Sequence, residues 1–240
     1  MKIIISGYGR MGKAVEEVCQ QRGHEIVTII DTPSDWEKAT LPSHDTVVID
    51  FSMPGEAVNN ILRCFRLGLP IVTGTTGWYK DLETVKKACA KTQGTLFYTP
   101  NFSLGVNILF HINRLLAKIM ASAEGYRPSI SETHHIHKMD APSGTALLLA
   151  EDILHENPQL KKWKNVPDDD PHTLPILSFR EDEVPGIHEV VYDSEVDRLT
   201  LKHEAKSRKG FALGAVLAAE FIRKKKGIFT MQDYLKTMGL

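Results

Sequence analysis

The residues best suited to chemistry lie in one short segment, residues 130–146, with the sequence Ile-Ser-Glu-Thr-His-His-Ile-His-Lys-Met-Asp-Ala-Pro-Ser-Gly-Thr-Ala. Within it, His134 and His135 can give or take a proton near neutral pH, and Lys138 adds a full positive charge. Strand-like residues precede the segment and an apolar helical pattern follows it, so a strand-to-helix turn is predicted. A cationic group beside a proton donor suits a reaction of a small acid.

The end of this segment predicts further groups that bind an anion, at the start of a helix. Pro142-Ser143-Gly144-Thr145 places hydroxyl groups and a small residue directly before the apolar stretch Leu147–Ile153. The free N–H groups of a helix N-terminus, together with its dipole, favour a carboxylate or a phosphate. We therefore expect Ser143, Gly144 and Thr145 to contact an anionic group of the substrate.

The chain opens with the pattern of a dinucleotide-binding β-α-β unit. The apolar strand Lys2–Ser6 is followed by Gly7-Tyr8-Gly9-Arg10-Met11-Gly12, a helical pattern, and a second strand at His24–Ile30 that ends at Asp31. Glycines at these positions allow a tight turn and a close approach of the backbone to a pyrophosphate. Residues 7–12 are therefore predicted to bind the cofactor, and Asp31 is predicted to accept a hydrogen bond from a ribose 2′-hydroxyl.

Asp31 also bears on the choice between NADH and NADPH. It is followed by Thr32-Pro33, with no adjacent Arg or Lys. Because a carboxylate repels a 2′-phosphate, NADH is expected to be the favoured cofactor. Arg10 and Lys38 could still reach a phosphate, so the use of NADPH stays open.

Strands and helices continue to alternate as far as residue 123. Further strands are predicted at Thr46–Asp50, Pro70–Thr73 and Thr95–Tyr98, and helices at Glu56–Leu67, Lys80–Thr92 and Leu104–Ala123, whereas Trp36–Pro42 shows little regular pattern. This alternation is typical of a Rossmann-like, doubly wound parallel sheet in an α/β fold. Gly74-Thr75-Thr76-Gly77 follows the fourth strand, where its glycines either let the backbone approach a flat ligand or form an ordinary tight turn.

The pattern changes after Gly125. A strand at Tyr126–Thr133, a helix at Ser143–Glu156, a polar loop at Asn157–His172 and strands at Leu174–Arg180, His188–Ser194 and Asp197–Ala205 are predicted, followed by helices at Phe211–Arg223 and Met231–Lys236. The last two of these strands alternate apolar and polar residues, as in a half-buried antiparallel sheet. We therefore expect a second, smaller α+β domain with a mixed sheet that carries the anion-binding segment.

Composition limits the possible partners and the compartment. The 240 residues are 42% hydrophobic and 25% charged, with a formal net charge of −1, which favours neither nucleic acid nor a membrane as a partner. No apolar run is long enough to span a bilayer, and Met1 leads straight into a strand, so no signal peptide is expected. Cys19, Cys64 and Cys89 lack metal-ligand spacing, which indicates reduced thiols in a cytoplasmic protein.

The motif Glu132-x-His134-His135-x-x-Lys138-x-Asp140-Ala141-Pro142-Ser143-Gly144-Thr145-Ala146 resembles the substrate motif of the dihydrodipicolinate reductase family. The resemblance extends to both ends of the chain, although the first glycine motif is one residue shorter than in many members. It implies reduction of a small cyclic dicarboxylate, 4-hydroxy-tetrahydrodipicolinate, to tetrahydrodipicolinate with loss of water, in the diaminopimelate route to lysine. It also implies NADH or NADPH as cofactor and a homotetramer.

The resemblance assigns roles to individual residues. His134 matches the proton donor, Lys138 the second catalytic residue, which stabilises negative charge and holds a carboxylate, and His135 a substrate contact, while Gly144 and Thr145 match the carboxylate cradle. The implied cofactor contacts after the third, fourth and fifth strands are Phe51, Ser52, Gly74, Thr75, Thr76, Thr99, Pro100, Asn101 and Phe102. A cofactor domain of residues 1–103 and 208–240 would deliver a hydride to a substrate held by a substrate-binding and oligomerisation domain of residues 104–207.

Other interpretations remain. Another dehydrogenase of the same architecture would need a different substrate motif, and a ligand sensor without activity would be free to lose His134 or Lys138. The histidines His134, His135 and His137 could ligate zinc, but adjacent histidines on an extended segment point to opposite faces and Lys138 would oppose a cation. We therefore predict no metal. The acids of the motif, Glu132 and Asp140, are expected to orient neighbours or cap the helix rather than act as bases.

Overall fold

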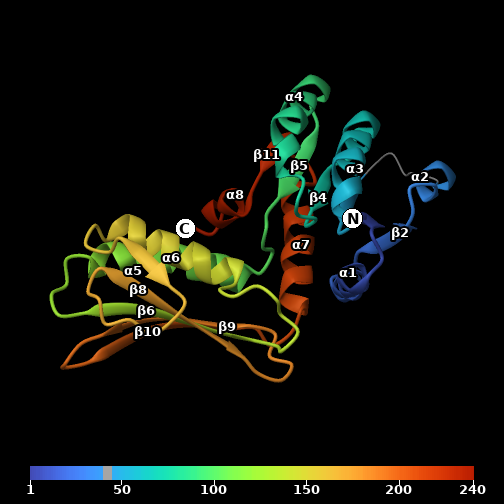
Figure 1. The fold of residues 1–240 in the computed structure, drawn as a ribbon. Helices are drawn as coiled ribbons and strands as arrows, with labels where there is room; N and C mark the ends of the chain where they lie inside the picture. The colour runs from blue at the N-terminus through green and yellow to red at the C-terminus, as the bar shows by residue number, and fades with distance from the viewer. Residues whose placement is uncertain (40–44) are drawn as a thin grey trace. The chain divides into compact units, whose positions relative to one another are not determined.

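The structure is a computed structural model that describes residues 1–39 and 45–240 (Figure 1). The chain divides into two compact units, Met1–Leu104 with Arg208–Leu240, and Gly105–Ser207. Each unit has a sheet and a hydrophobic core of its own. The roles that the sequence assigns to these two parts of the chain stay predictions.

The sheet of the first unit has six parallel strands in the order β11-β5-β4-β3-β1-β2. The strands are β1 (Lys2–Ser6), β2 (Glu25–Ile30), β3 (Thr46–Asp50), β4 (Ile71–Thr73), β5 (Thr95–Tyr98) and β11 (Gly227–Phe229). The chain runs from β1 outward to β2 and then returns to add β3, β4 and β5 on the other side of β1. The strand order therefore reverses between β1 and β3, and ligands of such sheets bind outside the carboxyl ends of the strands at this point.

Helices cover both faces of this parallel sheet. They are α1 (Arg10–Gln21), α2 (Asp35–Lys38), α3 (Pro54–Leu67), α4 (Leu82–Thr92), α7 (Lys209–Ile222) and α8 (Met231–Lys236), with a short 3-10 turn at Tyr79–Asp81. Helices α3 and α4 share a core with Ile4, Val48 and Leu96. Helices α1 and α7 pack against each other, and α7 also contacts β3, β4 and β5. Since successive strand residues point to opposite faces, the buried neighbours Ile3 and Val47 face the other helix pair. The predicted doubly wound sheet is confirmed.

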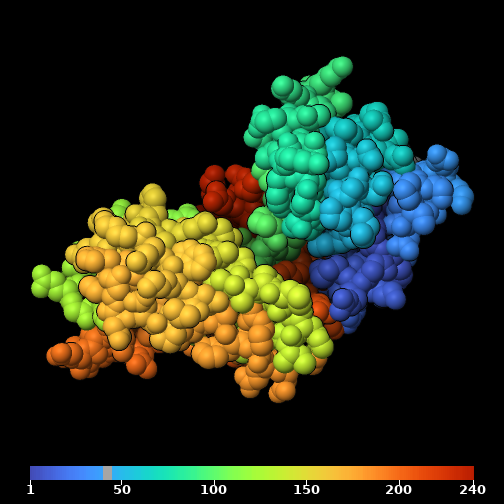
Figure 2. All heavy atoms as spheres, viewed as in Figure 1, coloured from blue at the N-terminus to red at the C-terminus, as the bar shows by residue number. Residues whose placement is uncertain are grey.

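The second unit has a mixed sheet in the order β10-β9-β6-β8-β7. Its strands are β6 (Arg127–His134), β7 (Lys162–Lys164), β8 (Thr173–Arg180), β9 (Ile187–Asp193) and β10 (Arg198–Glu204), and its helices are α5 (Leu104–Met120) and α6 (Gly144–Glu156). Strand β6 is antiparallel to β9 and parallel to β8. In the space-filling view, the atoms of α6 and of the loop after it, drawn in yellow, cover much of the visible face of this unit (Figure 2).

One face of the mixed sheet carries both the core and the polar residues of interest. Along β6 the buried positions are Ile130, Glu132 and His134, and His188 on β9 pairs directly with Glu132. Ile130 belongs to a core formed with residues of α5 and α6. Because alternate residues of a strand share a face, the buried acid and the histidines lie on this helix-covered side.

Three short elements differ from the sequence predictions. Strand β7 lies inside the predicted polar loop Asn157–His172, and strand β11 follows the basic run after α7. Helix α2 begins at Asp35 and overlaps the stretch Trp36–Pro42, of which residues 40–42 lie outside the described residues. Each contains only three or four residues and lies in or next to a polar or charged stretch, whereas the equally short β4 and β5 were predicted from their apolar residues. In the part of the chain that the structure describes, no helix is both long and apolar enough to cross a membrane.

Candidate functional site

The glycine turn after β1 has the tight backbone that a nucleotide requires. Gly7 has a φ of +83°, and a Cβ there would lie 2.4 Å from the carbonyl oxygen of Phe51. A Cβ on Gly12 would lie 2.2 Å from the carbonyl oxygen of Gly7, so only glycine fits at either position. Gly9, the N-cap of α1, is open instead: a Cβ there would meet no described atom within 4 Å. The start of α1 is therefore accessible to an anionic ligand.

A hydrogen bond ties this turn to the end of β2. The N–H of Tyr8 donates to Oδ1 of Asp31 at 2.9 Å, and Asp35 accepts hydrogen bonds from the N–H groups of Asp31 and Thr32. The adjoining pocket is lined by Ser6, Gly7, Ile30, Asp31, Thr32, Pro33, Trp36, Ser52, Glu56 and Asn60. These described lining residues include acids and no lysine or arginine. This composition suits a ribose hydroxyl better than a 2′-phosphate.

A buried carboxylate, Asp50, holds together the loops at this edge of the sheet. It accepts hydrogen bonds of 2.8–3.1 Å from Ser6, Asn60, Thr73 and Thr75. The hydroxyl of Thr75 also lies 3.1 Å from the carbonyl oxygen of Ser52. The loops after β3 and β4 are therefore fixed relative to the end of β1.

Aromatic packing connects the remaining predicted cofactor-binding segments. A Cβ on Gly74 would lie 2.1 Å from the ring of Phe51, and that ring meets Phe102 edge-on at a centroid distance of 5.8 Å. In the turn after β5, the hydroxyl of Thr99 donates to the carbonyl oxygen of Asn101 at 3.0 Å. All predicted cofactor-binding residues follow directly after β1, β2, β3, β4 or β5, at the carboxyl ends of parallel strands. That they bind a cofactor stays a prediction.

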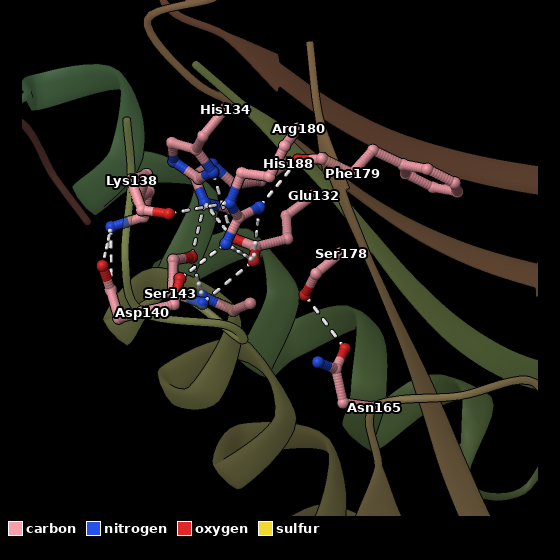
Figure 3. Close-up of polar contacts among 11 residues, drawn as sticks. Glu132, His134, Lys138, Asp140, Ser143, Asn165, Ser178, Phe179, Arg180 and His188 are labelled. Carbon is pink, nitrogen blue, oxygen red and sulfur yellow. Dashed lines mark hydrogen bonds and ion pairs between the residues drawn. The ribbon is translucent and has the colours of Figure 1, made fainter. Parts of the chain in front are cut away.

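In the second unit, His134 closes strand β6 beside a buried acid (Figure 3). Its Nδ1 atom lies 3.1 Å from Oε2 of Glu132, whose side chain is completely buried. The Nε2 atom of His188 lies 3.9 Å from the same oxygen, and the rings of the two histidines are 5.0 Å apart at 72°. The Nδ1 and Oε2 atoms are close but not aligned, and within the described residues neither has a hydrogen bond to another group.

The second oxygen of Glu132 has two further partners. It accepts the N–H of Ser143 at 3.0 Å, and the guanidinium of Arg180 lies 3.4 Å away. Burial favours the neutral carboxyl, but the contacts with His134 and Ser143 outweigh it and hold the pKa of Glu132 well below its usual range. Burial and the neighbouring His134 lower the pKa of His188 to about 3. At neutral pH the site therefore contains an ionised carboxylate beside a neutral His188.

Lys138 lies in the loop after β6 and is paired with an acid of the same loop. Its Nζ donates to both carboxylate oxygens of Asp140, at 2.7 and 2.8 Å. Burial alone would raise the pKa of Asp140, and the hydrogen bonds from Lys138 lower it overall. The other predicted substrate contact of this loop, His135, is half-buried, and the exposed His137 lies 3.4 Å from Glu183.

The three residues at the start of α6 differ in their exposure to solvent. Ser143 is buried, and its Oγ accepts the N–H of Ala146 and lies 3.2 Å from Nε2 of His188. Gly144 is exposed, with no described atom within 4 Å of a built Cβ, and Thr145 is half-buried. The Ser143 hydroxyl thus serves as the helix cap, whereas Gly144 and Thr145 are accessible. A substrate contact by any of the three stays a prediction.

Three of these groups also have the spacing of metal ligands. Ligand atoms of Glu132, His134 and His188 lie within 4.8 Å of one another. This set shares only His134 with the three histidines considered from the sequence. Arg180, 3.4 Å from the carboxylate, opposes a cation here, so we retain the prediction that the site holds no metal.

Comparison with known proteins decides the family. The sequence profile "Dihydrodipicolinate reductase, N-terminus" matches residues 1–102, and "Dihydrodipicolinate reductase, C-terminus" matches residues 105–235. The chain belongs to the dihydrodipicolinate reductase family. A 4-hydroxy-tetrahydrodipicolinate reductase from Christiangramia forsetii is 46% identical over 239 residues, which cover 99% of each chain. One from Lawsonia intracellularis is 33% identical and covers 97% of this chain and 98% of its own. The predicted family, and with it the prediction of a reductase, is confirmed.

Solved structures agree with this membership at the level of the fold. A dipicolinate-bound dihydrodipicolinate reductase from Paenisporosarcina sp. TG-14 has a TM-score of 0.76 at 20% identity, over 96% of this chain and 97% of that one. A scyllo-inositol dehydrogenase from Lactobacillus casei, solved with NAD(H) and scyllo-inositol, has a TM-score of 0.53 at 11% identity, over 95% and 91% of the chains. The predicted fold class is confirmed.

Sequence reasoning missed three residues around these sites. Asp50 closes a fully buried strand directly after Val47, Val48 and Ile49, and an acid in that position could have indicated a buried cluster. His188 begins an alternating pattern, but only the pairing of β6 with β9 places it beside Glu132. Arg180 carries no local signal, because its position depends on the register between β6 and β8.

Proposed function

We propose that this chain reduces 4-hydroxy-tetrahydrodipicolinate to tetrahydrodipicolinate, with loss of water, in the diaminopimelate route of lysine biosynthesis. The observation that carries the proposal is the buried pair His134–Glu132, which lies in the same unit as Lys138 and the accessible start of α6. Close relatives along the full chain are named for this activity. The overall reaction consumes one hydride and one proton for each water released.

The first unit is the proposed site of NADH or NADPH. The tight turn at Gly7 and Gly12 and the open start of α1 suit a pyrophosphate. Asp31 suits the ribose, and its charge favours NADH. We assign the nicotinamide to the loops that carry Phe51 and Thr75, which Asp50 holds in place. When bound, the reduced nicotinamide supplies the hydride.

The second unit is the proposed site of the dicarboxylate. Lys138 and the N–H groups of Gly144 and Thr145 hold a carboxylate, and the substrate must compete with Asp140 for the ammonium of Lys138. His134 donates the proton that the reduced ring requires. Because Nδ1 of His134 faces Glu132, Nε2 is the atom that gives this proton. The ionised carboxylate of Glu132 lies beside Nδ1 of the same ring.

A cytoplasmic homotetramer completes the proposal. On the side of the mixed sheet opposite the helices lie Leu177, Phe179 and Val191, and 51% of the surface of Phe179 is exposed. Packing of such faces between subunits would bury these apolar side chains. Light scattering coupled to gel filtration would give four times the chain mass, and the mass of a single chain would exclude the tetramer.

The activity can be tested with the product of dihydrodipicolinate synthase, made in the same cuvette. We expect absorbance of the reduced nicotinamide to fall when this substrate is added, faster with NADH than with NADPH. A sample without the synthase controls for cofactor oxidation that does not depend on substrate. The absence of substrate-dependent oxidation with both cofactors would refute the proposed function.

A further inference from the structure

One arginine outside the substrate motif connects the groups of the second unit that the proposed reaction uses. Arg180 is the last residue of β8, and its guanidinium lies 3.4 Å from Oε1 of Glu132. The other oxygen of that carboxylate lies 3.1 Å from Nδ1 of His134. The guanidinium and the proposed proton donor are therefore linked through a single buried acid (Figure 3).

The same guanidinium also holds the loop that carries Lys138. It donates to the carbonyl oxygen of Lys138 at 3.3 Å and to that of Asp140 at 2.5 Å, and to the carbonyl oxygen of Phe179 at 2.7 Å. The carbonyls of Lys138 and Asp140 flank Met139, so the backbone that follows the lysine is attached to the end of β8. A planar fork with several N–H donors can make all of these contacts at once, and the point charge of a lysine cannot.

We propose that Arg180 and Glu132 act as a positioning pair that sets the relative geometry of His134 and Lys138; this inference rests on the proposed function. Glu132 presents its charge to Nδ1, which leaves Nε2 as the donor atom. Arg180 compensates the buried charge, keeps Glu132 in place and fixes the lysine loop. Neither residue is assigned a contact with substrate or cofactor, so their effect is exerted through the two groups they hold.

A third contact extends the pair to the carboxylate cradle. The N–H of Ser143 donates to Oε1 of Glu132 at 3.0 Å, and Gly144 follows directly at the start of α6. The buried carboxylate of Glu132 thus contacts His134, the guanidinium that holds the lysine loop, and the N–H of Ser143 at the start of α6. Removal of the Arg180 guanidinium leaves the charge of Glu132 buried and unpaired, which costs free energy. We expect the proton donor, the lysine loop and the start of α6 to be displaced as a result.

Kinetics of Arg180→Lys and Arg180→Ala test this positioning role. A displacement of about 1 Å can lower a rate by about 100-fold, so we expect kcat/KM to fall by about that factor in both variants, with unchanged affinity for NADH. Arg198 is the matched control, because it lies in the same unit and pairs through a fork with Asp193 at an exposed site. Arg198→Lys and Arg198→Ala should keep the parent kinetics.

Chemical rescue separates positioning from a contribution to stability. Free guanidinium ions should restore a measurable part of the rate of Arg180→Ala, and methylammonium ions should not, because only the former reproduces the planar fork. Guanidinium should not raise the rate of the parent or of Arg198→Ala. Since Arg180→Lys retains the charge, it serves as the test if Arg180→Ala does not fold. Parent-like kinetics in Arg180→Lys would overturn the proposal.

Nitrogen-15 NMR of the histidine rings gives a readout that does not depend on activity. In the parent protein, we expect neutral His134 to carry its proton on Nδ1, and Glu132→Gln and Arg180→Lys to give a mixture of the two tautomers. If the parent protein oxidises neither nicotinamide, the proposed function fails, and the tautomers still test the positioning pair. An identical His134 spectrum in the parent and both variants would contradict the positioning role of Arg180 and Glu132.

Discussion

The Nδ1 atom of His134 lies 3.1 Å from Oε2 of Glu132, so the two nitrogens of this imidazole have different surroundings. The other edge of the ring faces Gly186, where a Cβ would come within 3.0 Å of Nε2. A glycine at that position keeps Nε2 clear of a neighbouring side chain. One nitrogen therefore lies beside a buried acid, and the proposed function assigns proton donation to the other.

His134→Gln is expected to lower kcat by about 100- to 10,000-fold, because general acid catalysis typically contributes that much. The dissociation constant for NADH should stay the same, since the proposed nucleotide site lies in the other unit. Stopped-flow turnover and fluorescence titration measure the two quantities. His137→Gln is the control, because His137 lies in the loop directly after β6 with 71% of its side chain exposed. Equal turnover in His134→Gln and the parent would remove His134 as the proton donor.

Lys138 and Asp140 should respond to substitution in opposite directions. A hydrogen bond between charged groups contributes about 1.5–3 kcal/mol, so Lys138→Ala should raise the KM for the dicarboxylate by roughly 10- to 100-fold. Asp140→Asn should lower this KM, because it weakens the internal competitor for the ammonium. Lys206→Ala, at an exposed lysine of the same unit, should leave KM unchanged. An increase in KM in Asp140→Asn would show that the carboxylate does not compete with substrate.

Asp31→Ser should shift the cofactor preference toward NADPH. The carboxylate lies at the end of β2 beside the glycine turn, where it would repel the 2′-phosphate of a bound NADPH. We expect the ratio of the dissociation constants for NADPH and NADH to fall by about tenfold, which is about 1.4 kcal/mol. Asp81→Ser, in the 3-10 turn of the same unit, should preserve the parent ratio. The same ratio in Asp31→Ser and the parent would place the ribose elsewhere.

His188 should make the second unit less stable in acid. Its pKa is about 3 in the folded chain, against about 6.5 for an unperturbed histidine, so the unfolded state binds the extra proton. This stability is present above pH 6.5 and is lost as the pH falls toward 3, by about 2 kcal/mol at pH 5.

Urea unfolding at pH 7 and pH 5 measures this linkage. In His188→Gln the loss of unfolding free energy between the two pH values should be smaller than in the parent by about 2 kcal/mol. His155→Gln should behave as the parent does, because 83% of the side chain of His155 is exposed. An equal pH dependence in His188→Gln and the parent would contradict the burial of a neutral His188.

Chelation should leave the rate unchanged, because we assign the reaction to His134 and Lys138 without a metal. Activity after dialysis against EDTA should equal that of the untreated protein. Addition of Zn²⁺ then tests the set Glu132, His134 and His188, where Arg180 should keep the affinity weak. Loss of activity on chelation that Zn²⁺ restores would show that the site requires a metal.

Local patterns predicted most of the fold and the positions of the motifs. The glycine turn, the acid after β2 and the strand-to-helix turn at residue 143 depend on short-range rules, and each lies at its predicted place. The alternation of strands and helices was sufficient to predict the parallel sheet. The short strands β7, with the sequence Lys-Trp-Lys, and β11, which follows three lysines, gave no such pattern.

The features of the candidate site that could not be predicted from the sequence depend on contacts between strands. The pairing of Glu132 with His188 and the reach of Arg180 from β8 depend on sheet register, which no local pattern in β6 encodes. The pairing of Lys138 with Asp140 depends on loop conformation rather than on residue type. The residues that position the proposed catalytic groups were therefore the least predictable part of the candidate site.

Transfer of the label from NADH that carries deuterium at both positions of carbon 4 of the nicotinamide ring tests the central claim most directly. The substrate is supplied by dihydrodipicolinate synthase, and the product is analysed by mass spectrometry. We predict one deuterium in tetrahydrodipicolinate from the labelled cofactor in ordinary water. A product without deuterium from the labelled cofactor would contradict the proposed hydride transfer.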